Sequence, residues 1–308
     1  MRATLVLAGL VLAVPSFHPH ILPPFRLSTL PPQSVQAPPG TDIFVAPFKR
    51  VAGKLTVGTP VNVTARAGYD NQPSFSPDGG SVYYTSMRGG QADIYRYDFA
   101  RKAGTQVTRT PESEYSPTVM PDGKHLSVVR VERDSTQRLW EFTLDGKAVK
   151  PLLDSIKPVG YQAWFNADTV FVFVLGQPVT LRRAELASGT AQIVAHDIGR
   201  AIAKVPNGRA MSYVQRDSAG GTIRVLNAVT GAARDLARLP EGVEFYTWTP
   251  DGDVLCASGS RLLHRRPGDT KWNEVRRFAQ AGLQKISRIA VSPTGDRIAL
   301  VGEEAKAR

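Results

Sequence analysis

Short runs of alternating apolar and polar residues follow a turn that recurs along the chain. In its clearest copy, Pro77-Asp78-Gly79 is followed by Val82 and Tyr84, whose spacing of two is the period of a strand that buries one face. Proline presets the backbone angle at the first central turn position, aspartate bonds the backbone two residues on, and glycine accepts a positive φ. Residues 72–84 therefore predict a strand, a tight turn and a second strand.

Further copies of this turn give the chain an internal repeat. The residues at the first turn position, here called the anchors, are Pro77, Pro121, Asn166, Pro206, Pro250 and Pro293. Successive anchors are separated by 44, 45, 40, 44 and 43 residues. A period of about 40–45 residues with several short strands per unit is typical of propeller blades. The sequence predicts an all-β fold, a six-bladed β-propeller.

Hydrophobic positions keep the same register in all six repeats. The residues five and seven places after each anchor are apolar or aromatic, as a strand packed between blades requires. Three places before each anchor the residue is small, and two places before it the residue is mostly large, with Lys204 as the polar exception. We expect the large residue of one blade to pack on a small residue of its neighbour, and Lys204 to mark a weaker interface.

The two ends of the chain each carry half a repeat. Residues 41–45 and 60–64 resemble third and fourth strands, whereas residues 289–291 and 297–301 resemble a first and a second strand. We therefore predict two-plus-two strand closure of the last blade by the N-terminal segment, which removes the open sheet edges. Glycines are expected in the turns between third and fourth strands, at Gly53, Gly104, Gly146, Gly189, Gly231 and Gly268.

The N-terminus has the pattern of an export signal. Arg2 precedes an apolar run over residues 5–14 that ends at Pro15, a length that suits a signal peptide and is short for a membrane span. This interpretation divides the chain into a signal peptide (1–16), a Pro-rich leader (17–40) and the propeller (41–308), with no transmembrane span after signal removal. An uncleaved hydrophobic N-terminus is the alternative. The single cysteine, Cys256, allows no internal disulfide and is expected to be a small buried residue.

One group of motifs resembles a known family. The run Phe75-Ser76-Pro77-Asp78-Gly79, followed by Asp93-Ile94-Tyr95, resembles the WD-like repeat of the TolB-type six-bladed propellers. The resemblance covers residues 40–308 and is best in the first two blades. It implies the propeller fold and a periplasmic or secreted location. TolB proteins carry a further α/β domain ahead of the propeller, for which this sequence leaves no room, so no role in the Tol system is carried over.

Residues with catalytic potential are scattered along the sequence. The turn chemistry already accounts for Asp78, Asp122 and Asp251, and the sequence contains no nucleophile elbow and no phosphate-cradling glycine loop. The sequence therefore predicts no catalytic set, no metal and no cofactor. The histidines show no metal-ligand spacing and no common register: His18, His20, His125, His196 and His264.

The loops that enter the first strands carry the candidate binding residues. These loops are expected to gather around the axial channel, on the face where propellers meet their ligands. Aromatic and arginine side chains, which are frequent in contact surfaces, recur among them. The alternative is that the tyrosines fill gaps between blades. The predicted binding residues are Tyr69, Asp70, Asn71, Glu114, Tyr115, Tyr161, Arg200, Glu244, Phe245, Tyr246 and Arg288.

Charge gives a second indication of the partner. The formal net charge is +11, and much of it comes from residues 261–288, where eight Lys and Arg residues oppose only Asp269 and Glu274. If exposed, this stretch would favour an acidic partner. A basic outer rim without a function is the alternative. Nucleic acid is a frequent partner of basic proteins, but the export signal argues against it.

Together these patterns predict an exported, non-catalytic β-propeller binding or scaffolding module, a monomer that takes part in protein-protein interaction in the cell envelope. Its partner is expected to be an envelope protein or an anionic polymer, with no nucleic acid. A propeller enzyme, either a metal-dependent lyase or a hydrolase with an axial active site, is the alternative. A set of His or carboxylate side chains at the channel mouth, together with bound metal, would favour the enzyme.

Overall fold

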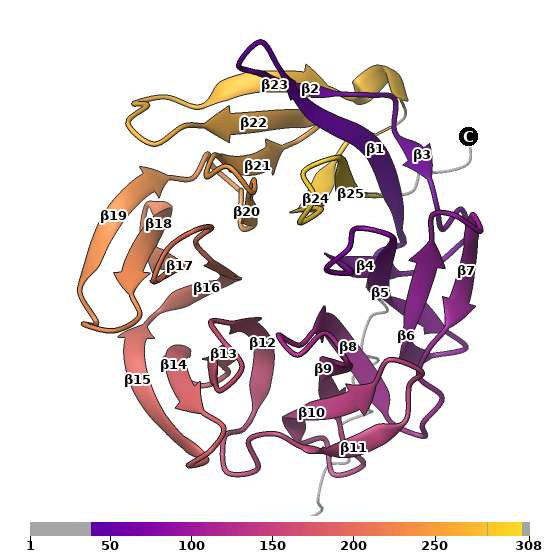
Figure 1. The fold of residues 1–308 in the computed structure, drawn as a ribbon, viewed down its shortest axis with the longest axis vertical. Helices are drawn as coiled ribbons and strands as arrows, with labels where there is room; N and C mark the ends of the chain where they lie inside the picture. The colour runs from indigo at the N-terminus through magenta and orange to yellow at the C-terminus, as the bar shows by residue number, and fades with distance from the viewer. Residues whose placement is uncertain (1–37, 282, 304–308) are drawn as a thin grey trace, which may run out of the picture. The chain divides into compact units, whose positions relative to one another are not determined.

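A computed structural model describes residues 38–281 and 283–303. The predicted signal peptide (1–16) and most of the predicted leader (17–40) lie outside these residues. The described part contains strands and one short 3-10 helix, η1 (Ala279–Ala281). Its six sheets stand side by side in chain order around a central axis, which confirms the predicted six-bladed β-propeller (Figure 1).

Blades 1 to 3 are four-stranded antiparallel sheets whose strands follow chain order from one edge of the sheet to the other. Blade 1 consists of β4 (Asp70–Phe75), β5 (Ser81–Arg88), β6 (Gln91–Asp98) and β7 (Ala103–Gln106). Blade 2 consists of β8 (Ser113–Val119), β9 (His125–Val131), β10 (Gln137–Thr143) and β11 (Ala148–Pro151). Blade 3 consists of β12 (Val159–Trp164), β13 (Thr169–Val174), β14 (Thr180–Glu185) and β15 (Thr190–His196).

Blades 4 and 5 repeat this order, and blade 6 joins the two ends of the described chain. Blade 4 consists of β16 (Ile198–Lys204), β17 (Ala210–Asp217), β18 (Gly220–Asn227) and β19 (Ala233–Arg238). Blade 5 consists of β20 (Tyr246–Trp248), β21 (Val254–Ser258), β22 (Arg261–Arg265) and β23 (Asn273–Arg277). Blade 6 consists of β24 (Ile286–Val291), β25 (Arg297–Glu303), β1 (Thr41–Val51), β2 (Lys54–Val57) and β3 (Val61–Asn62).

The predicted closure is present in blade 6. Strand β1 pairs antiparallel with β25 over seven residue pairs, from Thr41 opposite Glu303 to Pro47 opposite Arg297. The N-terminal segment thus supplies the third strand of a sheet whose first two strands come from the C-terminal end. Backbone hydrogen bonds between the two ends close the ring, so neither end is left as an open sheet edge.

The fourth strand of blade 6 differs from the prediction. We expected residues 60–64 there, but β2 and β3 share the outer position, each pairing with a different half of β1. The eleven-residue β1 is long enough for both partners. Ala52 and Gly53, with φ of 47° and 77°, form the two-residue hairpin turn that brings β2 back along Phe48–Val51.

The repeated turns form as the sequence predicts. In blade 1 the Gly79 amide donates to the Ser76 carbonyl at 2.9 Å, and Asp78 Oδ1 accepts from the Gly80 amide at 2.9 Å. Asn166 replaces this chemistry in blade 3, where its side-chain oxygen accepts from the Thr169 amide at 2.7 Å. One predicted glycine turn is wrong: Gly104 lies inside β7, and Lys102, with φ of 51°, takes the left-handed position of that connection.

The second strand of every blade is buried between its neighbours. Burial of one such side chain stabilises the fold by about 2 kcal/mol. The residues seven places after the anchors lie on the same face of their strands as those five places after and are also buried. The residues six places after the anchors point to the opposite face and are buried as well, so both faces of these second strands are packed. The residues five places after the anchors are fully buried in all six blades: Val82, Leu126, Phe171, Met211, Leu255 and Ile298.

The predicted large and small residues of neighbouring blades share apolar clusters at two boundaries, Phe75 with Ala290 and Trp248 with Ala203. The sequence did not reveal a polar detail of these boundaries. The indole of Trp164 in blade 3 donates to the Ser127 hydroxyl of blade 2 at 2.9 Å. Trp248 of blade 5 makes the equivalent bond to Ser212 of blade 4 at 2.8 Å. Lys204 stands where these tryptophans do, and its ammonium lies 5.4 Å from the centre of the Phe165 ring of blade 3. A cation–π contact thus replaces the packed ring at that interface.

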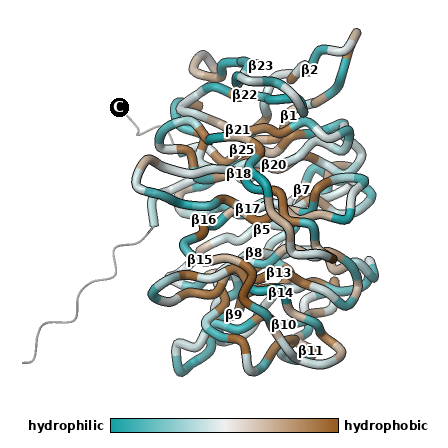
Figure 2. Tube along the Cα trace, turned by 90° about the vertical axis from the view of Figure 1, so that its left-hand side faces the viewer, coloured by the Kyte–Doolittle hydropathy of each residue, from teal (hydrophilic) through white to brown (hydrophobic). Residues whose placement is uncertain are grey.

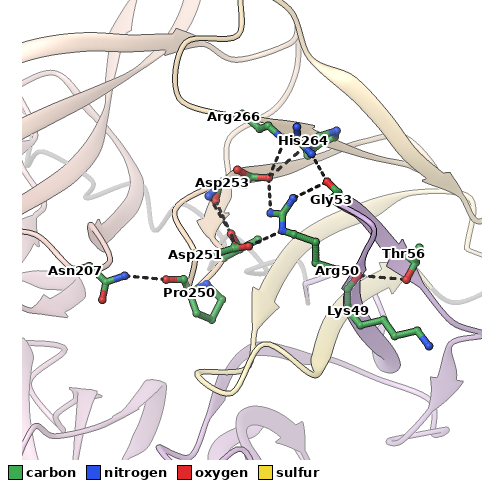
Figure 3. Close-up of polar contacts among 11 residues, drawn as sticks. Lys49, Arg50, Gly53, Thr56, Asn207, Pro250, Asp251, Asp253, His264 and Arg266 are labelled. Carbon is green, nitrogen blue, oxygen red and sulfur yellow. Dashed lines mark hydrogen bonds and ion pairs between the residues drawn. The ribbon is translucent and has the colours of Figure 1, made fainter.

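An ion-pair cluster fastens the N-terminal hairpin to blade 5 (Figure 3). Arg50 in β1 contacts Asp251 Oδ2 through Nε at 2.6 Å and Asp253 Oδ2 through Nη2 at 2.7 Å. The Asp253 side chain is only 7% exposed, so its charge depends on these partners. Arg266 of blade 5 also donates to the Gly53 carbonyl of the β1–β2 turn. The closing segment is therefore held by side chains as well as by the β1–β25 ladder.

Hydrophobic and hydrophilic stretches alternate along the trace in the side view (Figure 2). This agrees with strands that are buried on the inside and polar in their connections. Among the described residues, no helix has the length and apolar character needed to cross a membrane.

Replacing Arg50 by methionine tests the contribution of the closing cluster. Arg50→Met leaves Asp253 buried without its main cation, and we expect the free energy of unfolding in urea to fall by about 2 kcal/mol. The matched control is Arg277→Met, which breaks the exposed Arg277–Glu274 pair and should change stability by less than about 0.5 kcal/mol. Equal effects of the two substitutions would contradict a closing role for Arg50.

Candidate functional site

A cavity of about 560 Å³ opens at the axis of the propeller, here called the mouth cavity. It lies where the connections into the first strands gather, and the end of β21 and the residues around β24 complete it. Pro38, Pro39, Tyr69 and Phe245 supply apolar and aromatic wall. A concave site that combines such walls with a few charged groups is typical of ligand sites in proteins.

The mouth cavity brings together seven of the eleven predicted binding residues. The shared feature of these seven is a position at the entry of a first strand. Their role in binding stays a prediction. They are Tyr69, Asn71, Tyr161, Arg200, Glu244, Phe245 and Arg288.

The other four predicted residues do not line the mouth cavity. Asp70 and Glu114 are fully buried, at equivalent places seven residues before their anchors. Tyr246 is 5% exposed and donates its hydroxyl to Ser212 at 2.7 Å. Tyr115 packs against the apolar cluster of blades 2 and 3. For Tyr246 and Tyr115 the alternative reading, a tyrosine that fills a gap between blades, describes what the structure shows.

A second, smaller cavity of about 210 Å³ lies along the axis, here called the axial chamber. Its wall includes the residue five places before each anchor, one per blade. This ring was not identified from the sequence, although the anchor spacing alone would have defined it. Arg288 is its only charged member, and Tyr161, Phe245 and Arg288 line both cavities. The ring consists of Gln72, Ser116, Tyr161, Ala201, Phe245 and Arg288.

Polar side chains fix the backbone of this ring in blades 1 to 3. Gln72 and Ser116 have φ of 58° and 53°, where the first strands bulge away from regular pairing. Gln72 Oε1 accepts from the Ser116 amide at 2.7 Å, across the boundary between blades 1 and 2. The Gln162 amide group donates to the Ser116 carbonyl at 2.7 Å, across the next boundary. Hydrogen bonds between blades thus position the channel wall, and Gln162 is a channel residue that the sequence did not reveal.

Arg288 and Tyr161 meet across the axis. They belong to β24 of blade 6 and β12 of blade 3, which lie on opposite sides of the ring (Figure 1). The Arg288 guanidinium donates to the Tyr161 hydroxyl at 3.5 Å and lies 5.3 Å from the centre of its ring. It also stacks on Phe245 at 3.9 Å. Arg288 and Tyr161 both line the mouth cavity and the axial chamber.

Burial and nearby cations determine the protonation of the mouth tyrosine. Burial raises the pKa of Tyr69 to about 12, although Arg288 and Arg200 oppose the shift. Tyr69 is therefore a neutral phenol at physiological pH. It can donate a hydrogen bond, and it cannot serve as a base.

Glu114 is a buried carboxyl beside the ring. Burial raises the pKa of Glu114 to about 7, although the hydroxyls of Thr110 and Thr108 and the guanidinium of Arg130 lower it. Glu114 Oε1 accepts from the Thr110 hydroxyl and lies 3.6 Å from Arg130 Nε. The neighbouring Glu112, which accepts from Arg130, has its pKa lowered by that bond. The pKa values of these two glutamates, two residues apart, are therefore shifted in opposite directions.

The histidines and acidic residues form local structural contacts. His125 Nδ1 lies 2.6 Å from Asp122 in the turn of blade 2, and His264 Nδ1 lies 3.7 Å from Asp253 in the closing cluster. Within residues 38–281 and 283–303, no three His, Cys, Asp or Glu side chains stand close enough together to hold a metal ion. The prediction of no metal and no cofactor is not tested by this arrangement.

Basic residues of the stretch 261–288 make different kinds of contact. Arg266 and Arg276 donate to the carbonyls of Gly53 and Val57 in the β1–β2 hairpin, so they hold blade 5 to blade 6. Lys285 pairs with Glu303 at 2.5 Å, and Arg288 lines the mouth cavity. Two of the eight basic residues of this stretch therefore hold blades 5 and 6 together.

Comparison with known proteins agrees with the propeller repeat. Residues 52–163 match the family described as the TolB beta propeller domain. Over 79 residues, 25% of this chain, the sequence is 32% identical to the Tol-Pal system protein TolB of Francisella tularensis. Over 114 residues, 36% of this chain, it is 31% identical to an uncharacterized protein of Agrobacterium fabrum. The matched parts span 18% and 36% of the lengths of these two relatives.

The structural similarity to a solved propeller covers more of this chain than the sequence matches do. The solved structure of a candidate TolB from Agrobacterium tumefaciens superposes with a TM-score of 0.69 over 86% of this chain and 99% of that chain. The two sequences are 14% identical, so this similarity shows the shared fold alone. Together with the matched repeat, it confirms the resemblance to the TolB-type propellers that the turn motifs suggested.

The pH dependence of stability tests the buried carboxyl of Glu114. Because its pKa is higher in the folded chain than in the unfolded chain, its contribution to stability is fully present below about pH 4.5 and is lost as the pH rises to about 7. Glu114→Gln removes this loss, and we expect it to raise the free energy of unfolding by about 1–3 kcal/mol at pH 8 relative to the wild type. Denaturant unfolding of both proteins at pH 5 and pH 8 measures the difference.

Glu112→Gln is the matched control for Glu114→Gln. Its lowered pKa means that ionised Glu112 stabilises the fold above its unfolded pKa, so this substitution should reduce stability at pH 8. A Glu114→Gln protein that is less stable than the wild type at pH 8 would contradict a buried carboxyl with a raised pKa.

Proposed function

Because the chain folds as a TolB-type six-bladed β-propeller, we propose that it is an exported, non-catalytic binding module that holds a protein partner of the cell envelope in its mouth cavity. We further propose that it acts as a monomer in the periplasm or outside the cell. The observation that carries this proposal is the mouth cavity, in which first-strand entries from different blades bring Tyr69, Phe245 and Arg288 into one concave site.

The composition of the mouth favours a protein partner. Aromatic side chains and arginine are enriched at protein interfaces, and tyrosine and arginine are among the residues that carry most of the binding energy there. Aromatic rings offer large contact areas with few rotatable bonds lost. Charged groups of both signs surround them, with Arg200 and Lys285 beside Glu244 and Glu303. Such mixed charge suits a polypeptide better than a uniformly anionic polymer, which would meet three glutamates here.

Export is supported by the sequence and by similarity to relatives. The Arg2-led apolar run has the form of a signal peptide. The partial similarity to a Tol-Pal system protein agrees with a location in the envelope. The axial enzyme stays the alternative function, and a stoichiometric metal in the purified protein together with turnover would favour it.

Site-specific crosslinking in the producing cell tests this proposal. A photoreactive benzoylphenylalanine at Ser287, which is exposed and lines the mouth cavity, should crosslink to an envelope protein identified by mass spectrometry. The matched control is the same residue at Lys124, in the exposed turn after β8 at the opposite end of a blade. The purified partner should reproduce the Ser287 crosslink and leave the Lys124 position unreacted. Equal labelling at both positions, or no protein crosslinked at Ser287, would contradict binding at the mouth.

A further inference from the structure

Arg288 is a half-buried cation without an acidic partner. Among the six residues five places before the anchors it is the only charged one, and Arg200 is the other charged residue in the wall of the axial chamber. Its described contacts are with two aromatic rings and one phenol hydroxyl at 3.5 Å. Among the described residues, no carboxylate lies within 4.0 Å of its guanidinium nitrogens, although many other arginines of the chain form such pairs.

Two of the three carboxylates that line the mouth cavity pair with other cations. Glu244 pairs with Arg216 at 2.7 Å and lies 3.9 Å from Arg200. Glu303 pairs with Lys285 at 2.5 Å. Glu241 also lines the cavity, is exposed, and forms no ion pair among the described residues. The guanidinium of Arg288 therefore keeps most of its hydrogen-bond capacity for a group that enters the mouth.

The geometry around Arg288 suits a planar, singly charged anion. A guanidinium presents its donors in a flat fork that matches a carboxylate, and Phe245 stacked at 3.9 Å fixes the plane of that fork. A dianionic phosphate would need more than one free cation, and Arg200 and Lys285 are already close to glutamates. The proline and aromatic walls of the cavity offer contact area for an apolar body next to the charge.

We propose that Arg288 anchors a carboxylate of a polypeptide partner, either an acidic side chain or a chain end, inside the mouth cavity. The inference rests on the proposed function, since it names the chemical group by which the mouth holds its partner. The entering carboxylate replaces the Tyr161 hydroxyl as the hydrogen-bond acceptor of Arg288. Phe245 keeps the guanidinium in place during this exchange.

Titration of the purified chain with short peptides, followed by NMR, tests the proposal. The probe is acetyl-Ala-Ala-Phe with a free C-terminal carboxylate, and its C-terminal amide is the uncharged counterpart. The acid should bind at least about tenfold more tightly than the amide, because only the acid can form the charge-assisted pair. Arg288→Met should abolish this preference, and Arg288→Lys should keep part of it, since lysine retains the charge and loses the fork.

The control substitution is Arg209→Met, which removes an equally charged, exposed residue outside both cavities and should leave binding unchanged. Urea unfolding of each variant establishes that it is folded. Equal affinity for the acid and the amide, or no binding of either, would overturn the proposal. Benzoate binding as tightly as the peptide, with the same dependence on Arg288, would overturn the polypeptide assignment and give the site to small carboxylates.

The crosslinking experiment separates this inference from the proposed function. If Arg288→Met leaves the Ser287 crosslink to the envelope partner at wild-type yield, the carboxylate anchor is wrong and binding at the mouth stands. If the peptide acid binds through Arg288 while no protein is crosslinked in the cell, the anchor stands and the envelope-partner function is wrong.

Discussion

The antiparallel ladder between β1 and β25 is the constraint on which the rest of this structure depends. It connects segments separated by more than two hundred residues, and without it blade 6 would separate into β24–β25 and the N-terminal strands, each with an unpaired edge. Its hydrogen bonds are supplemented by Arg50, whose two aspartate partners lie in blade 5. A chain with a single, buried cysteine thus closes its ring by strand pairing and ion pairs.

The candidate site inherits its geometry from this closure. The mouth cavity and the axial chamber both take wall from blade 6, and Arg288 reaches Tyr161 only because blade 6 stands opposite blade 3 in the closed ring. The wall is also fixed locally, since Gln72 and Gln162 carry hydrogen bonds from blade to blade. The first strands therefore both build the ring and carry the residues of the candidate site. A change in blade number would rearrange every residue of the mouth.

The sequence predicted the architecture because each blade needs the same turn and the same buried strand, and the residues that form them recur at a regular spacing along the chain. It predicted seven mouth residues because they belong to the loops that this period defines. The sequence predicted Asp70 and Glu114 at the mouth, but both are buried. The side chains of neighbouring strand residues point to opposite faces, and the bulges at Gln72 and Ser116 shift that alternation. The shared outer position of β2 and β3 followed from the length of β1, which no motif encodes.

Native-state hydrogen exchange of the β1 amides tests the closed ring most directly. If β1 is an integral strand of blade 6, its amides that bond to β25 will exchange as slowly as those of β25 itself, and both sets will lose protection together as urea is added. Rapid exchange throughout β1, while the strands of blades 1 to 5 and β25 remain protected, would contradict a propeller closed by its N-terminal segment.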